Sequence, residues 1–163
     1  MKHLWTPWRL TYLQGDTLPK DGCLFCTVLA EDDDEANLIL YRGERVAVML
    51  NKYPYTNGHL MLLPVEHVAS LAAASTRALA ELMQLAQACE RVLREAYGPE
   101  GFNMGINIGS AAGAGIPDHV HAHLLPRWEG DTNFMTTVAG MRIIPEDLSV
   151  TYRRLQELLL KHL

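Results

Sequence analysis

The chain has 163 residues and a net charge of −5; 48% of its residues are hydrophobic and 20% are charged. These values are typical of one globular domain, so we interpret residues 1–163 as a single domain. They argue against a broad cationic surface for nucleic acid or anionic lipid, and no apolar run is long enough to span a bilayer. The polar first ten residues do not resemble a signal peptide. We therefore expect a cytoplasmic protein without nucleic-acid or membrane partners.

An aromatic segment precedes the first predicted strand. Residues 1–20 include Trp5 and Trp8, and we interpret them as an N-terminal arm. Such an arm can dock on the body of the protein or on a second subunit, or it can contact substrate. Further along, five short apolar segments predict strands, at residues 38–41, 45–50, 59–64, 102–108 and 119–125.

Two segments have apolar residues at helical spacing, residues 75–97 and about 145–163. Gly98-Pro99 ends the first one. We expect the following residues to form the core stripes: Leu79, Leu82, Met83, Ala86, Cys89, Leu93 and Ala96, then Leu148, Tyr152, Leu155 and Leu159. Met61 and Met104 are also interpreted as packing residues. The fold class is therefore α+β, an antiparallel sheet of about five strands with one long helix on it and a C-terminal helix.

The segment from His119 to Pro126 carries three histidines in strict alternation. Because strand side chains alternate between faces, His119, His121 and His123 share one face and the apolar residues between them share the other. The apolar set can pack against a helix, whereas three imidazoles have no comparable packing use. Clustered histidine marks a chemical site.

A glycine-rich loop lies directly before this strand, from Asn107 to Pro117. Its glycines allow backbone N–H groups to approach an anion closely. The candidate phosphate-binding residues are Asn107, Gly109, Gly113 and Gly115. Beside the histidine strand, the loop places amide donors next to candidate nucleophiles, although the loop alone would be read as a flexible connection.

The pattern His-x-His-x-His, two apolar residues, proline and arginine resembles the signature of the histidine-triad family, and the resemblance runs from Cys23 to about Arg127. It implies that His121 attacks phosphorus and that His123 contacts phosphate. It also implies that Asn51 contacts the nucleoside and that His59 supports the catalytic histidines. A neutral imidazole is a good nucleophile at pH 7, and a covalent intermediate divides one difficult displacement into two easier ones.

Cys23 and Cys26 have the spacing of metal ligands. Alone, the pair could also be a redox couple or two buried small residues. The resemblance to zinc-bearing branches of the histidine-triad family implies that His67 and His119 complete a structural Zn²⁺ site, one ion per chain. Mg²⁺ could enter with the substrate without a protein cage of its own.

One alternative gives the three alternating histidines a different role. His119, His121 and His123 could together bind one catalytic zinc whose water is the nucleophile. This model leaves the Cys-x-x-Cys pair and the glycine loop without a role.

The outer segments Trp5–Arg9 and Pro126–Met135 resemble the bacterial branch that includes diadenosine tetraphosphate phosphorylases. This resemblance implies a homodimer that cleaves dinucleoside polyphosphates at the α-phosphate. Arg9, Lys52 and Arg127 could reach a polyphosphate. The chain departs from many hydrolase members, because Ala112-Gly-Ala-Gly115 lacks their glutamine, which weakens a diadenosine triphosphate hydrolase or phosphoramidase interpretation. The alternatives to cleavage of dinucleoside polyphosphates are a nucleoside phosphoramidase and a nucleotide-binding regulatory protein with negligible turnover.

Overall fold

The computed structural model describes residues 22–132 and 146–163, so the predicted N-terminal arm lies outside the described residues. Five strands form one antiparallel sheet in the order β1-β2-β3-β5-β4. The strand bounds are Ile39–Arg42 for β1, Val46–Leu50 for β2, Leu60–Pro64 for β3, Gly101–Ile106 for β4 and Ala122–Arg127 for β5. The predicted α+β fold with about five strands is confirmed, and each predicted strand appears with shifted ends.

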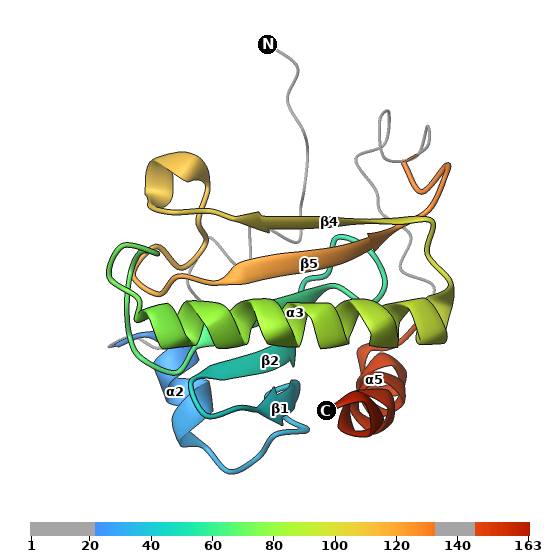
Figure 1. Cartoon of the computed structure of the whole chain (residues 1–163), viewed down its shortest axis with the longest axis horizontal. Coiled ribbons are helices and arrows are strands. Elements are labelled where there is room, and N and C mark those ends of the chain that lie inside the picture. Colours follow the sequence, from blue (N-terminus) through green and yellow to red (C-terminus); the bar gives the residue numbers. More distant parts are fainter. Residues whose placement is uncertain (1–21, 133–145) are drawn as a thin grey trace.

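Helix α3 (Thr76–Tyr97) runs across one face of this sheet, with α5 (Leu148–His162) beside it (Figure 1). Ser75 begins α3 by accepting a hydrogen bond from the backbone N–H of Ala78, and Gly98 ends it in the left-handed conformation, with φ 54°. Helix α5 begins at Leu148 after the cap Asp147, slightly later than predicted. Within the described residues, no helix is long and apolar enough to cross a membrane.

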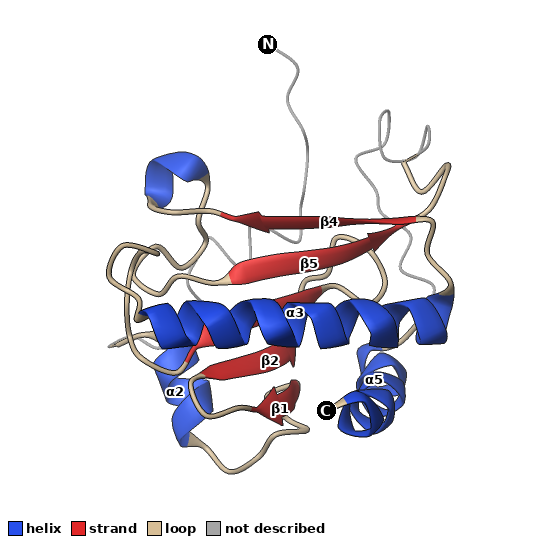
Figure 2. Ribbon diagram, viewed as in Figure 1, coloured by secondary structure: helices blue, strands red, loops and turns tan. Residues whose placement is uncertain are grey.

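The period-two pattern of the strands divides the core into two layers. Alternate residues of β2, such as Val46 and Val48, face α3, and the residues between them, such as Ala47 and Met49, face the other side. A short helix, α2 (Leu24–Ala30), covers that other side and buries Phe25 there (Figure 2). This helix was not predicted, because it has only seven residues, about two turns, and so its sequence shows no clear helical periodicity.

Two predictions about methionines are wrong. The side chains of Met83 and Met104 are 58% and 40% exposed, whereas Met61 is buried as expected. Met104 lies in β4, which is an edge strand and has β5 as its one partner in the described sheet. The long-helix stripe is buried at Leu82, Ala86, Cys89 and Leu93, whereas Leu79 and Ala96 are half-buried.

Strand β5 begins three residues later than predicted. Ala122 pairs with Leu62, but the next residues of β3 lead to Pro64, which has no backbone N–H to continue the ladder. The Pro64 carbonyl instead accepts a hydrogen bond from Nε2 of His119, and the Val120 N–H donates to Val68. His119 and His121 therefore precede the strand.

We predict that Gly58→Ala destabilises the protein by about 1–3 kcal/mol. Gly58 has φ 72°, and an added Cβ would lie 2.9 Å from Leu93 and 3.1 Å from Tyr97. Gly101→Ala is the matched control, because its Cβ would meet no atom within 4 Å. Urea unfolding measures both variants. Equal stability of the two variants would contradict this packing argument.

Candidate active site

A cavity of about 300 Å³ lies beside α2, on the side of the sheet that carries Met49 and Met61. Most of the predicted site residues line it: Asn51, Asn107, Gly113, Gly115, His121 and His123. Gly109 is not among its lining residues, and His59 lies behind His123. Its lining combines apolar residues such as Leu50, Met49 and Met61 with the polar groups named above, as small-molecule sites usually do.

The His121 ring is fixed in one tautomer. Its Nδ1 lies 2.9 Å from the backbone carbonyl oxygen of His119. Because a carbonyl only accepts hydrogen bonds, Nδ1 carries the proton and Nε2 keeps its lone pair. The edge of Phe25 contacts the ring, with the two ring centroids 5.0 Å apart. Burial lowers the pKa of His121 below its ordinary value. The side chain is therefore neutral at pH 7, with a free nitrogen lone pair.

A chain of hydrogen bonds determines the tautomers of His59 and His123. The Tyr55 backbone N–H donates to Nδ1 of His59 over 3.2 Å, and the Asn51 amide lies 3.3 Å from the same atom. Since His59 Nδ1 accepts, its Nε2 carries the proton and donates to Nδ1 of His123 over 3.0 Å. The proton of His123 is then on Nε2, which makes this nitrogen a donor at the cavity.

Both histidines at the cavity are kept uncharged. Burial, and secondarily the neighbouring His121, lower the pKa of His123 from 6.5 to about 4. The two rings meet edge to face, with centroids 4.9 Å apart. At pH 7 the site thus offers one bare imidazole nitrogen beside one imidazole N–H donor. This pairing suits attack on a phosphorus atom whose oxygens must be held.

The glycine loop folds back on itself beside these rings. A single 3₁₀ turn, η1 (Ser110–Ala112), lies between Gly109 and Gly113, which have φ 79° and φ 85°. Only glycine adopts such angles readily. Gly113 and Gly115 line the cavity, so their backbone lies at the site, whereas Gly109 shapes the turn.

Of the three cations named from the sequence, one lines the cavity. Lys52 is on its wall, and Arg9 lies outside the described residues. Arg127 instead forms two hydrogen bonds with the carboxylate of Asp131, at 2.6 and 2.7 Å, and a third with Asn103. Its guanidinium is therefore occupied in holding the end of β5.

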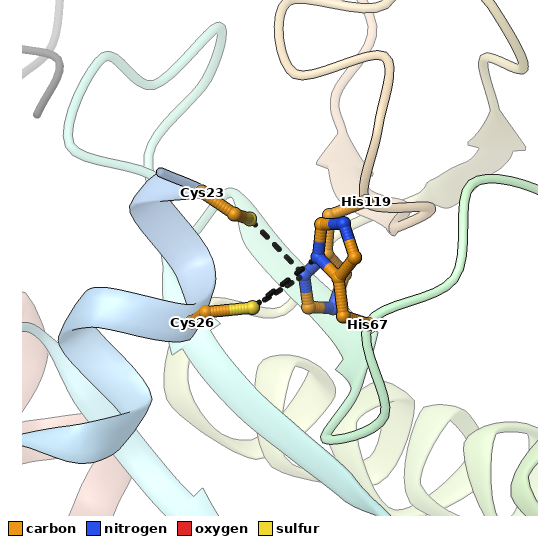
Figure 3. Close-up of side chains that lie close together, drawn as sticks. All are labelled: Cys23, Cys26, His67 and His119. Atoms are coloured by element: carbon orange, nitrogen blue, oxygen red, sulfur yellow. Dashed lines mark hydrogen bonds between the residues drawn. The ribbon is translucent and has the colours of Figure 1, made fainter. Parts of the chain in front are cut away.

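Cys23, Cys26, His67 and His119 converge from three separate segments, and Figure 3 shows their side chains pointing toward one another. Their donor atoms lie within 4.8 Å of one another. Nδ1 of His119 lies 3.3 and 3.7 Å from the two sulfurs, and Nδ1 of His67 lies 3.3 Å from Cys26 Sγ. Zinc–sulfur and zinc–nitrogen bonds in a tetrahedron place such donors about 3.5 Å apart. The cluster thus fits a zinc ion.

The three-histidine metal model does not fit this arrangement. His119 turns Nδ1 to the cysteines, His121 turns Nδ1 to a carbonyl, and His123 turns Nδ1 to His59. In the part of the chain that the structure describes, the Cys₂His₂ group is the one cluster of three or more candidate ligands. The same finding leaves no described carboxylate cage for Mg²⁺, so an ion carried by the substrate stays a prediction.

Two aromatic residues at the site were not anticipated from the sequence. Phe25 lies against both His119 and His121, and Tyr55 stacks on His59 with ring centroids 4.7 Å apart. Each could have been suspected from its neighbours, since Phe25 stands inside the cysteine pair and Tyr55 precedes His59 by four residues. Phe25 adds apolar surface to the surroundings of His119 and His121, and burial lowers the pKa of both rings.

The HIT domain model matches residues 33–130. The chain belongs to the HIT-domain family. A protein named "AP-4-A phosphorylase" from Mycobacterium tuberculosis is 38% identical over 161 residues, which cover 95% of this chain and 83% of that protein. A crystal structure of a zinc-bound histidine triad family protein from Mycobacterium smegmatis superposes with a TM-score of 0.70. It is 28% identical, and the match covers 86% of this chain and 94% of that one.

A histidine triad nucleotide-binding protein from Sulfolobus tokodaii also shares the fold, with a TM-score of 0.67 and 26% identity over 85% of this chain and 93% of that one. The predicted family, its branch resembling diadenosine tetraphosphate phosphorylases and the HIT-like fold are confirmed. The expectation of a HIT-family enzyme is confirmed with them.

We predict one tautomer for each histidine at the cavity of this HIT protein. Long-range ¹⁵N NMR of the imidazoles at pH 7 should show the proton on Nδ1 of His121 and on Nε2 of both His59 and His123, because of their hydrogen-bond partners. His123 should stay neutral until the pH approaches about 4, since its pKa is lowered to that value. A proton on Nε2 of His121, or protonation of His123 near pH 6.5, would contradict this electrostatic account.

Proposed function

We propose that this HIT-family enzyme transfers a nucleotidyl group from a dinucleoside polyphosphate, through a covalent intermediate on His121. The observation that carries the proposal is the bare Nε2 of His121 in a cavity lined by His123 and the glycine loop. Diadenosine tetraphosphate is the proposed substrate and orthophosphate the proposed acceptor. The name of the M. tuberculosis relative supports both choices.

The first step forms a phosphorus–nitrogen bond. Nε2 of His121 attacks the α-phosphorus, the bond from phosphorus to the bridging oxygen breaks, and the leaving nucleotide departs with that electron pair. Attack leaves positive charge on the imidazole, and Nδ1–H donates more strongly to the His119 carbonyl as this charge develops. A triphosphate leaving group is stable as an anion, so this step needs no glutamine to assist its departure.

Charge on the transferred phosphoryl group needs fixed donors. The Nε2–H of His123 is one, held in direction by the hydrogen bond from His59. Backbone N–H groups at Gly113 and Gly115 are the others that we propose, with Asn107 beside them. Donors that are positioned before the reaction stabilise developing charge without reorganising. Asn51 is proposed to contact the nucleoside while also supporting His59.

The second step returns the enzyme to its starting state. An orthophosphate oxygen attacks the same phosphorus, the phosphorus–nitrogen bond breaks, and its electron pair returns to Nε2 of His121. The products are ATP from the first step and ADP from the second. Water as acceptor would give AMP in place of ADP.

We predict that the protein converts diadenosine tetraphosphate and orthophosphate to ATP and ADP, as separated by anion-exchange chromatography. His121→Asn should lower turnover by on the order of 10³ or more, as loss of a covalent nucleophile does. AMP binding should persist in this variant because the phosphate donors remain. His162→Asn is the matched control, since His162 lies on α5 and pairs with Glu95.

The product pattern decides between the candidate functions. ATP and AMP would identify water as the acceptor, and cleavage of a nucleoside phosphoramidate alone would favour the phosphoramidase. AMP binding without any product would mean a regulatory binding protein. Substantial turnover by His121→Asn would contradict the role of His121.

We also propose that Cys23, Cys26, His67 and His119 hold one structural Zn²⁺ per chain. Their spacing supports this, as does the zinc-bound neighbour from M. smegmatis. When bound, the ion would supply a cross-link among α2, the segment after β3 and the start of the triad, and structural zinc contributes directly to folding. His119 Nε2–H donates to Pro64, which leaves Nδ1 as the ligand atom.

We predict that Cys23→Ser and His67→Ala lower both the zinc content and the melting temperature, because metal binding is coupled to folding. Plasma emission spectrometry gives the metal content and calorimetry the stability. Cys89→Ala is the control. Cys89 lies on α3 and is buried in the core between α3 and the sheet, so this variant should keep its zinc. Zinc-free wild-type protein with undiminished stability would refute the site.

A homodimer, which the family resemblance implies, is proposed through the outer edge of β4. Met104 on this strand and Ile108 after it are 40% and 44% exposed, and the strand's outer edge has no partner within the described sheet. Exposed sheet edges with apolar residues favour pairing with another chain. Sedimentation should give twice the 18.2 kDa chain mass, and Met104→Lys should shift it to the monomer. A wild-type monomer at all concentrations would refute this.

A further inference from the structure

The cavity has two chemically different ends, and α2 runs between them. Phe25 near the start of α2 contacts His121, whereas Asn37 lies beside Glu31, the residue that caps the other end of α2. Six residues of helix separate Phe25 from Glu31, or about 9 Å at 1.5 Å per residue. In the proposed binding mode the phosphorus lies at His121 and the base extends toward Asn37, which lines the same cavity.

The wall at this second end is mostly apolar. Val28, Ala36 and Leu38 line the cavity together with Asn37, which is the polar side chain among them. Apolar side chains accept the faces of any base, so they provide affinity without choosing among bases. A polar group at the edge of such a slot provides the selection.

The orientation of the Asn37 amide follows from its partner. Nδ2 donates to the Glu31 carboxylate over 2.8 Å. A carboxylate only accepts hydrogen bonds, so the nitrogen faces Glu31 and the oxygen Oδ1 is the atom left for the cavity. Glu31 itself does not line the cavity wall.

The backbone beside Asn37 is held in an unfavourable conformation. Leu38 has φ 59°, a value that a branched side chain rarely adopts. Its carbonyl accepts from Leu50 N–H, and Arg42 braces the same region by donating to the carbonyls of Leu29 and Glu31. Several hydrogen bonds thus hold the wall rigidly around Asn37, as specific readout of a base requires.

We propose that Asn37 is a specificity-determining residue, whose Oδ1 accepts a hydrogen bond from the exocyclic amino group of the base. The site then prefers a 6-aminopurine nucleotide. A 6-oxopurine would place a carbonyl oxygen opposite Oδ1, and two acceptors facing each other leave both unpaired. This inference rests on the proposed function, since it takes the cavity to be the nucleotide site.

The test compares AMP with IMP, which differ in having an amino group or an oxygen at position 6. Calorimetry on the full wild-type chain should show AMP binding on the order of tenfold more tightly than IMP. Asn37→Ala should weaken the binding of AMP and leave the binding of IMP nearly unchanged, so that the two affinities converge. Gln84→Ala, which removes an exposed amide on α3, is the control and should keep the wild-type difference.

A second variant keeps the inference testable if Asn37→Ala does not fold. Glu31 is exposed, and Glu31→Gln gives Asn37 a partner that both donates and accepts hydrogen bonds. The Asn37 amide can then rotate by half a turn, and the preference for AMP over IMP should shrink. Equal wild-type affinities for AMP and IMP, or an undiminished preference in Asn37→Ala, would overturn the inference alone. Failure of both nucleotides to bind would instead overturn the proposed function on which it rests.

Discussion

His119 joins three parts of the molecule through three different atoms. Its Nδ1 faces the two cysteines, and its Nε2–H donates a hydrogen bond to the carbonyl of Pro64, the last residue of β3. Its backbone carbonyl accepts a hydrogen bond from Nδ1–H of His121. The Cys₂His₂ cluster, the sheet and the proposed nucleophile His121 therefore meet at one residue. A backbone shift at His119 would displace both its ring and the carbonyl that selects the tautomer of His121.

The tautomers of the other imidazoles are determined in the same way, by partners that can only donate or only accept a hydrogen bond. Tyr55 contributes a backbone N–H that can only donate, and the tautomers of His59 and His123 follow from it. Neutrality has a separate cause at His121 and His123, because burial lowers the pKa of both rings. Hydrogen bonds thus decide which nitrogen of each ring carries the proton, and burial keeps His121 and His123 uncharged.

Much of this arrangement could be predicted from the sequence, for physical reasons. Short apolar segments predict the strands, Gly98-Pro99 predicts the end of the long helix, and the alternating histidines predict one shared side. The later start of β5 could not be read locally, since it depends on Pro64 in a strand that lies opposite only after folding. The exposure of Met104 depends likewise on which strand is at the sheet edge.

The histidine tautomers and the orientation of the Asn37 amide also could not be predicted from local sequence patterns. Each depends on a partner distant in the fold or on a single hydrogen bond whose direction the sequence does not record. Helix α2 has too few residues for a periodicity, yet it carries Phe25 and Cys26, and Cys23 is its N-cap. The candidate histidines were recognisable in the sequence, His59 among them, whereas the contacts of Phe25 and Tyr55 with these rings were found in the structure.

The claim that Nε2 of His121 is the nucleophile is tested most directly by isolating the covalent intermediate. Full-length enzyme is mixed with diadenosine tetraphosphate without orthophosphate, quenched in alkali after milliseconds, and mapped by peptide mass spectrometry. The account predicts an adenylyl group on His121, stable in alkali and labile in acid, which disappears as ADP forms when orthophosphate is added. Continued turnover without any adduct, or an adduct on His123, would contradict it.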